Sequence, residues 1–133
     1  MIIELKKNNL EIIKDSFLST SYVENEFSNN PFAKFLILIE KNEIIGYLYY
    51  SDIYDRIEIN QFEIKNIHRN CGKGSILLKE LLDKTEKDIS LEVKNDNDPA
   101  IHLYEKFGFK KVAIRKGYYH GIDAILMERK YRI

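Results

Sequence analysis

The 133-residue sequence has one cysteine, no long hydrophobic run and no excess of either charge. A single cysteine excludes a disulfide within the chain and is typical of a reducing compartment. The longest apolar run covers residues 35–39, far short of the roughly 20 residues that cross a bilayer. The start of the chain also lacks a basic segment followed by an apolar one. We therefore expect no secretory signal, no membrane contact and a cytoplasmic location.

The balance of charge argues against a nucleic-acid binder, because basic and acidic side chains both number 21. The two halves nevertheless differ. Residues 1–66 carry seven basic and 11 acidic side chains, whereas residues 67–133 carry 14 and ten. The basic half would attract an anionic cofactor and the acidic half a cationic substrate, or the asymmetry is due to chance.

The length predicts a single domain over residues 1–133, since there is no room for two separate cores. Its first half predicts a strand over 2–5, a helical apolar stripe over 10–18, and a short helix that a capping box opens at Ser21 and that ends near Pro31. Strands rich in Ile, Leu, Tyr and Phe follow over 33–40, 43–53 and 56–64.

The second half predicts alternating helices and strands. A helix with a leucine stripe covers 75–84, a strand 89–93, and a second helix starts at Asp98 and stops before Gly108. Two strands, over 111–115 and 122–127, complete the chain. The whole order predicts an α/β (α+β) fold built on one mixed sheet.

The first segment that carries chemistry is a glycine-rich connection between strand 56–64 and helix 75–84. Gly72 and Gly74 let a ligand approach the backbone, and a helix N-terminus attracts phosphate. The loop is neither a Walker A loop nor a dinucleotide fingerprint, because Ser or Thr does not follow Lys73 and Leu77 stands where a third glycine is needed. Alone, it predicts a phosphate site or merely a tight connection.

A second segment makes the pattern specific. Residues 97–109 read Asn-x-x-Ala-x-x-Leu-Tyr-x-x-x-Gly-Phe, and residues 69–74 read Arg-x-x-Gly-x-Gly. Together the two blocks resemble the GNAT N-acetyltransferase superfamily and its acetyl-CoA signature. The strand 91–93, the stretch 115–119 and Asp123-Ala124 with Met127 look most like the ribosomal-protein-alanine N-acetyltransferase (RimI-type) branch. Residues 55–130 carry almost all of the resemblance.

The resemblance implies a single GNAT-like domain with a mixed central sheet of about six to seven strands and about four flanking helices. Strands 56–64 and 89–93 would splay apart and form the acetyl-CoA cleft. The cofactor-binding residues that it implies come from the first strand, the loop and the second motif: Phe62, Glu63, Ile64, Arg69, Asn70, Cys71, Gly72, Lys73, Gly74, Ser75 and Asn97. Cys71 is read as a small tolerated residue, with a thiol activated by the helix N-terminus as the alternative.

The resemblance also assigns two catalytic residues. Glu92 is the expected general base for the amine, and Tyr104 the expected general acid for the departing thiolate. A carboxylate removes a proton more easily from an α-ammonium group, with a pKa of about 7.7–8.0, than from the lysine ammonium, with a pKa of about 10.4. The alternatives are a solvated strand glutamate and a core tyrosine. Asn97, likewise, is either a cofactor ligand or only a helix N-cap.

Other polar and aromatic side chains are weighed in the same way. Tyr118 and Tyr119 are candidate substrate-binding residues that wall the acceptor groove, or ordinary strand tyrosines. The three histidines, His68, His102 and His120, have no metal-ligand spacing, so we predict no metal site.

Together these observations predict an acetyl-CoA-dependent N-acetyltransferase that transfers acetyl directly to a protein N-terminal α-amine, such as a ribosomal protein alanine. The alternatives are a GNAT enzyme for a small amine or polyamine, and a non-catalytic acyl-CoA-binding sensor. The expected partners are acetyl-CoA and an amine acceptor, without nucleic acid or membrane, and the expected oligomeric state is a monomer or weak homodimer.

Overall fold

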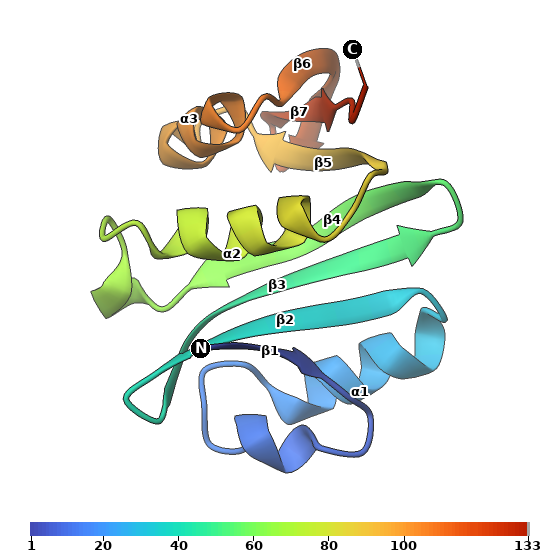
Figure 1. Cartoon of the computed structure of the whole chain (residues 1–133). Helices are drawn as coiled ribbons and strands as arrows, with labels where there is room; N and C mark the ends of the chain where they lie inside the picture. Colours follow the sequence, from blue (N-terminus) through green and yellow to red (C-terminus); the bar gives the residue numbers. More distant parts are fainter. Residues whose placement is uncertain (133) are drawn as a thin grey trace.

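The computed structural model describes residues 1–132, which form one seven-stranded mixed sheet (Figure 1). Its strand order is β1-β2-β3-β4-β5-β7-β6. All neighbours are antiparallel except β4 and β5, which run parallel. The strands are β1 (Ile2–Leu5), β2 (Ala33–Glu40), β3 (Glu43–Ile53), β4 (Arg56–Ile64), β5 (Asp88–Lys94), β6 (Lys110–Tyr119) and β7 (Ile122–Arg129).

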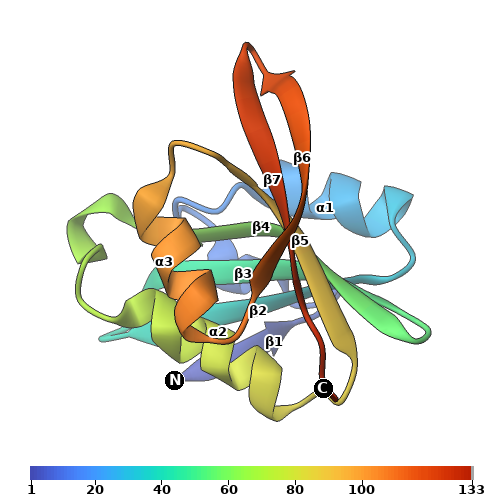
Figure 2. The same ribbon diagram turned by 90° about the horizontal axis from the view of Figure 1, so that it is seen from above.

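Helices cover both faces of this sheet. One face carries α2 (Lys73–Asp83) and α3 (Asp98–Lys106), and the other carries α1 (Thr20–Asn29), as the view from above shows (Figure 2). Two 3₁₀ turns, η1 (Leu10–Ile13) and η2 (Asn66–His68), complete the described helical structure. Residues 1–132 contain no helix with the length and apolar character needed to span a membrane.

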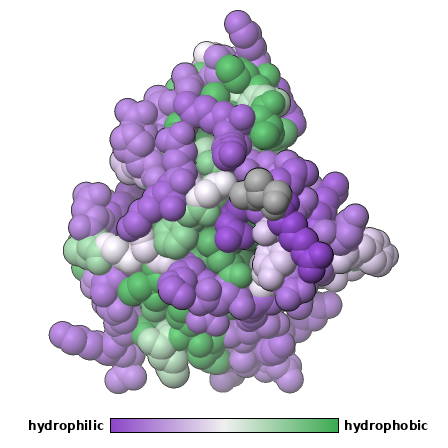
Figure 3. Space-filling model, turned by 45° about the horizontal axis from the view of Figure 1, so that its top comes forward, coloured by the Kyte–Doolittle hydropathy of each residue, from purple (hydrophilic) through white to green (hydrophobic). Residues whose placement is uncertain are grey.

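Each face has its own apolar core. The leucine stripe of α2 is buried at Leu77, Leu78 and Leu81 against the inner strands. On the α1 face, a smaller core gathers around Phe35 and Tyr49, whose rings stack at 4.3 Å between centroids. Hydrophilic residues cover most of the surface seen in Figure 3, with hydrophobic ones in small separate areas. The predicted mixed α/β architecture is therefore confirmed.

The three strands β2, β3 and β4 have the predicted ends, whereas β6 extends four residues beyond the predicted 111–115, to Tyr119. The helix expected over residues 10–18 is wrong, since only the 3₁₀ turn η1 forms there. Lys14 adopts extended angles and Asp15 has a φ of 62°, so the helix cannot continue. Ile13 and Leu18 are still buried, which explains the apolar stripe without a helix. The about four helices expected become three α-helices and two 3₁₀ turns in the described chain.

The start of α1 also differs from the prediction. The capping residue is Ser19 rather than Ser21, because the Ser19 hydroxyl accepts a hydrogen bond from the Tyr22 N–H at 3.2 Å. The helix consequently begins two residues earlier than the capping box at Ser21 predicts.

Strands β4 and β5 part in the middle of the sheet. They pair only from Arg56↔Asp88 to Ile59↔Leu91, after which β5 keeps β7 as its neighbour and β4 keeps β3. On β3, the consecutive residues Tyr49 and Tyr50 pair with Gln61 and Ile59 of β4. Asn60 between them has no partner on β3 and forms a β-bulge. The predicted splay is confirmed, and it exposes one edge of the second half of β4.

Candidate functional site

The gap between β4 and β5 holds a cavity of about 350 Å³. Its walls come from both strands and from α3. Glu92 on β5 and Tyr104 on α3 line it together with Asn97, Ala100 and Tyr119. The structure thus brings the two predicted catalytic side chains to one cavity from elements that are separate in the sequence.

A second and larger cavity, of about 550 Å³, lies over the glycine-rich loop. It is lined by all the predicted cofactor-binding residues but one: Phe62, Glu63, Ile64, Arg69, Asn70, Gly72, Lys73, Gly74, Ser75 and Asn97. The exception is Cys71, whose exposed thiol donates to the Arg69 carbonyl at 3.4 Å. Asn97 and Ala100 line both cavities, so the two adjoin.

The loop is shaped to receive an anion on its backbone. Asn70 and Gly72 have left-handed φ values of 63° and 77°, and Gly72 caps α2 without a side-chain hydrogen bond. The first N–H groups of α2 are therefore left for a ligand at the positive end of the helix dipole. A Cβ on Gly74 would lie 3.2 Å from Leu103 Cδ2 and 3.6 Å from Phe62 Cζ, inside the cavity wall. These features fit a pyrophosphate.

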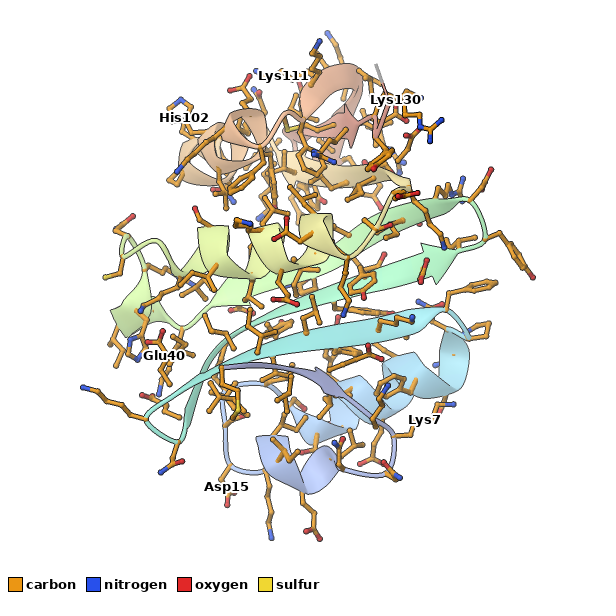
Figure 4. All side chains as sticks on the ribbon, viewed as in Figure 1. Lys7, Asp15, Glu40, His102, Lys111 and Lys130 are labelled. Atoms are coloured by element: carbon orange, nitrogen blue, oxygen red, sulfur yellow. The ribbon has the colours of Figure 1, made fainter. Side chains whose placement is uncertain are left out.

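Both cations of the loop are already paired within the protein. Lys73 Nζ donates to Glu40 Oε2 at 2.9 Å, and this hydrogen bond lowers the pKa of Glu40. Figure 4 shows Glu40 at the end of β2, beside the start of α2. Arg69 Nε donates to the Ile64 carbonyl at 2.9 Å. Each of the two cations thus already has a hydrogen-bond partner within the protein.

Glu63 directs its side chain away from the α2 face. It is paired in register with Tyr47 of β3, whose hydroxyl donates to Glu63 Oε2 at 2.9 Å. Tyr47 belongs to the core under α1. Burial first, and the Glu63 contact second, raise the pKa of Tyr47. The charge of Glu63 is thus accommodated on the α1 face, and the Glu63 backbone remains on the edge of β4.

Glu92 lies at the junction of two cavities. Besides the gap, it lines an outer hollow of about 260 Å³ with Glu58, Ser90, Tyr118 and Tyr119. Arg115 Nη2 donates to Glu92 Oε1 at 3.1 Å. The same guanidinium stacks over Tyr118, 4.3 Å from the ring centroid.

Tyr104 faces the gap from the other side. Its side chain is buried between Phe62 and Phe109, with ring centroids 6.3 and 5.6 Å away. Burial raises the pKa of Tyr104 to about 12, so the phenol keeps its proton at physiological pH. Tyr104 therefore packs in the core and also borders the gap, and its role as general acid stays a prediction.

Asn97 is the N-cap of α3, and its contact with the cofactor stays a prediction. Its Oδ1 accepts from the Ala100 N–H at 3.3 Å as the N-cap of α3, and the residue lines both cavities. Tyr118 and Tyr119 lie on the β6–β7 hairpin, which projects from the sheet (Figure 2).

The histidines occupy unrelated places. His102 lies on the outer side of α3 (Figure 4), His68 Nε2 is 3.3 Å from Glu43 Oε1, and His120 is in the hairpin turn with a φ of 49°. Within residues 1–132 there is no group of three His, Cys, Asp or Glu residues placed to hold a metal ion. The absence of a metal stays a prediction.

Sequence reasoning missed several residues that line the cavities. His68 and Leu103 line the loop cavity, and Glu58, Asn60 and Ser90 line the outer hollow. Leu103 is part of the second motif, but no binding role was predicted for it. Glu58 and Asn60 depend on the register and bulge of β4, and Ser90 depends on its pairing with β4, for which the sequence carries no local signal.

Comparison with known proteins identifies this architecture. The model of the acetyltransferase (GNAT) family matches residues 6–109. The chain belongs to the GNAT acetyltransferase family. A putative ribosomal protein bS18-alanine N-acetyltransferase of Bacillus subtilis is 33% identical over 120 residues, covering 86% of this chain and 76% of that protein. The ribosomal protein bS18-alanine N-acetyltransferase of Haemophilus influenzae is 39% identical over 88 residues, covering 63% of this chain and 60% of that protein.

Solved structures agree with the fold. The ribosomal-protein-S18-alanine N-acetyltransferase of Escherichia coli has a TM-score of 0.83 at 24% identity, over 100% of this chain and 94% of that one. A GNAT acetyltransferase of Elizabethkingia anophelis with acetyl-CoA bound has a TM-score of 0.77 at 19% identity, over 98% and 97%. This GNAT protein is an N-acetyltransferase with acetyl-CoA as its acetyl donor, as predicted.

Proposed function

We propose that this GNAT enzyme acetylates a protein N-terminal α-amine, with a ribosomal protein as the leading acceptor, and that it works as a single domain. The observation that carries the proposal is the meeting of Glu92 and Tyr104 in one cavity at the parting of β4 and β5. The relatives from B. subtilis and H. influenzae, named for alanine acetylation of a ribosomal protein, support the acceptor class.

Acetyl-CoA would lie across the loop cavity and the gap. The pyrophosphate would meet the backbone N–H groups at Gly72 to Gly74, and the thioester end would reach the gap along the open edge of β4. Acetyl-CoA supplies a thioester, whose acyl carbon–sulfur bond breaks as the nitrogen–carbon bond to the acceptor forms. Direct transfer then requires two proton movements, each assigned to one side chain.

Glu92 would accept the proton of the acceptor amine, directly or through one water. Its carboxylate borders both the gap and the outer hollow, so an amine that enters from the hollow reaches it before it reaches the acetyl group. Arg115 occupies one oxygen of this carboxylate and has to share or release it when the amine binds.

Tyr104 would donate a proton to the leaving sulfur. A pKa of about 12 keeps the phenol protonated and ready, but it makes the transfer uphill toward a thiolate whose conjugate acid ordinarily has a pKa of about 8.5. Burial in the same cavity also raises the pKa of the CoA thiol, so the difference between the pKa values of the phenol and the thiol becomes smaller.

The acceptor would lie in the outer hollow beneath Tyr118 and Tyr119. Because Glu58 and Glu92 both line that hollow, a cationic small amine or polyamine is the second candidate acceptor. A sensor that only binds acyl-CoA needs neither a carboxylate nor a phenol in the gap, so this third candidate ranks last.

The test is CoA release from acetyl-CoA with a panel of acceptors. The panel contains N-terminal peptides, including a ribosomal sequence that starts with alanine, and polyamines and aminoglycosides. We expect turnover with the alanine-start peptide and a loss of at least about tenfold in Glu92→Gln, which corresponds to about 1.4 kcal/mol in the barrier. The matched control is Glu105→Gln, an exposed glutamate of α3, which should behave as wild type.

Two outcomes would contradict the proposal. Turnover of amines but not of peptides would give the acceptor role to a small amine. Binding of acetyl-CoA without turnover across the whole panel would favour the sensor.

A further inference from the structure

Apart from tyrosines, Ser51 of β3 is the one buried polar side chain in residues 1–132. Its hydroxyl accepts two hydrogen bonds, from Asn30 Nδ2 at 2.8 Å and from Asn60 Nδ2 at 2.7 Å. Asn30 Nδ2 also donates to the Tyr49 hydroxyl at 2.9 Å, and Tyr49 donates to Glu26 at 2.8 Å. A polar chain therefore runs from α1 to the bulge of β4 and ends at the Asn60 carboxamide.

The bulge turns two consecutive side chains to the same face of the sheet. Ile59 is buried in the core under α2 and α3, and Phe62 packs against that same core. Between them, Asn60 is bonded to Ser51, and Gln61 lines a hollow with Tyr22 and Tyr47 on the α1 face. Without the bulge, regular alternation would have sent one of these two amides to the α2 face.

Strand register places Asn60 beside Glu92. The last pair between the parallel strands is Ile59↔Leu91, and both of these side chains are buried in the core under α2 and α3. The next residue on each strand points to the opposite face, where strands lie about 4.8 Å apart before they diverge. Asn60 and Glu92 line both the gap and the outer hollow.

The hydrogen bond to Ser51 fixes which end of the Asn60 amide is free. Its NH₂ group is committed to the serine, and no hydrogen bond to its Oδ1 forms within residues 1–132. The exposed end of Asn60 is therefore an acceptor oxygen, next to the carboxylate of Glu92. A primary amine bound there would meet two oxygen acceptors, one from each strand.

We propose that Asn60 binds the amine that receives the acetyl group. Its side-chain carbonyl oxygen accepts a hydrogen bond from one N–H of the amine, while Glu92 accepts one from the other N–H. With the carbon substituent and two N–H bonds fixed, the nitrogen lone pair has a single direction, which can be aimed at the acetyl carbon. This inference rests on the proposed function for the position of the amine beside Glu92, but it holds for any primary amine.

The test compares Asn60→Leu with Asn60→Asp. Leucine fills about the same space but has no oxygen that could accept a hydrogen bond from the amine. Aspartate keeps such an oxygen and can accept a hydrogen bond from the Ser51 hydroxyl. We expect the KM for the acceptor to rise about tenfold or more in Asn60→Leu and to stay within about threefold of wild type in Asn60→Asp. The KM for acetyl-CoA should change less than about twofold in both. Asn25→Ala, on the exposed part of α1, is the matched control.

The kinetics are measured with the alanine-start peptide and with spermidine in parallel. If only spermidine is turned over, the N-terminal assignment fails while Asn60 is still tested on that amine. Equal losses in Asn60→Leu and Asn60→Asp, or a rise in the KM for acetyl-CoA instead of the acceptor, would overturn the inference and leave Asn60 as a structural anchor of the bulge.

Discussion

The two sides of the gap between β4 and β5 are built in different ways. On the loop side, the proposed ligand contacts come from the backbone at Gly72 and Gly74, and the nearby cations are bonded to Glu40 and to the Ile64 carbonyl. On the outer side, the proposed contacts come from the side chains of Glu92, Asn60 and the hairpin tyrosines. Backbone geometry is suited to one constant ligand, whereas side chains are suited to selecting one acetyl acceptor among several.

Tyr104 stands at the boundary between these two sides, so its variant has the largest expected effect. Tyr104→Phe removes the hydroxyl and leaves the packing against Phe62 and Phe109. We expect kcat to fall about 100-fold, the lower end of the range for general acid catalysis, with both KM values within about twofold. Steady-state kinetics with the peptide acceptor measure this effect.

The same residue makes a prediction about pH. A pKa of about 12 means that Tyr104 is in its protonated, proton-donating form throughout the range below that value. The wild-type kcat should therefore show no fall due to Tyr104 as the pH rises to about 10. A descending limb near pH 9 that disappears in Tyr104→Phe would show that the phenol titrates earlier and would contradict this assignment.

Gly74→Val probes the backbone-built side, with a smaller expected effect. The added Cβ would lie 3.2 Å from Leu103 Cδ2, and the valine methyl groups would extend further into the cavity. We expect the KM for acetyl-CoA to rise at least about tenfold, while the acceptor KM changes little. Gly74→Ala should give an intermediate value, because the tip of the Leu103 side chain can shift. A rise in the acceptor KM alone would contradict the assignment of the loop side to acetyl-CoA. Thermal unfolding checks that the variants keep the fold.

This contrast also explains how far the sequence could be read. The loop and the second motif are each a continuous stretch of sequence, so Gly72 and Gly74 could be proposed from local spacing and Asn97 from the resemblance. The runs rich in Ile, Leu, Tyr and Phe predicted the ends of β2, β3 and β4. Asn60 was missed because its orientation depends on a bulge against β3 and a register against β5. The incorrect helix over residues 10–18 shows the same limit, since Ile13 and Leu18 are buried by tertiary contacts although no helix connects them.

The smallest expected effect belongs to Lys73→Met. A lysine beside a phosphate loop is easily taken for a phosphate ligand, but here its ammonium is 2.9 Å from Glu40 and its side chain is 23% exposed. If backbone donors carry the pyrophosphate, losing this charge should raise the KM for acetyl-CoA by less than about threefold, the size of a weak or screened ion pair. The measurement is the KM for acetyl-CoA at low and high ionic strength, with Lys79→Met, an exposed lysine of α2 paired to Asp83, as the matched control. An increase of more than about tenfold at low salt that shrinks at high salt would mean that Lys73 leaves Glu40 for the phosphate. The loop side would then bind its ligand through a charged side chain as well as through the backbone. The two sides of the gap would differ only in how much each depends on side chains.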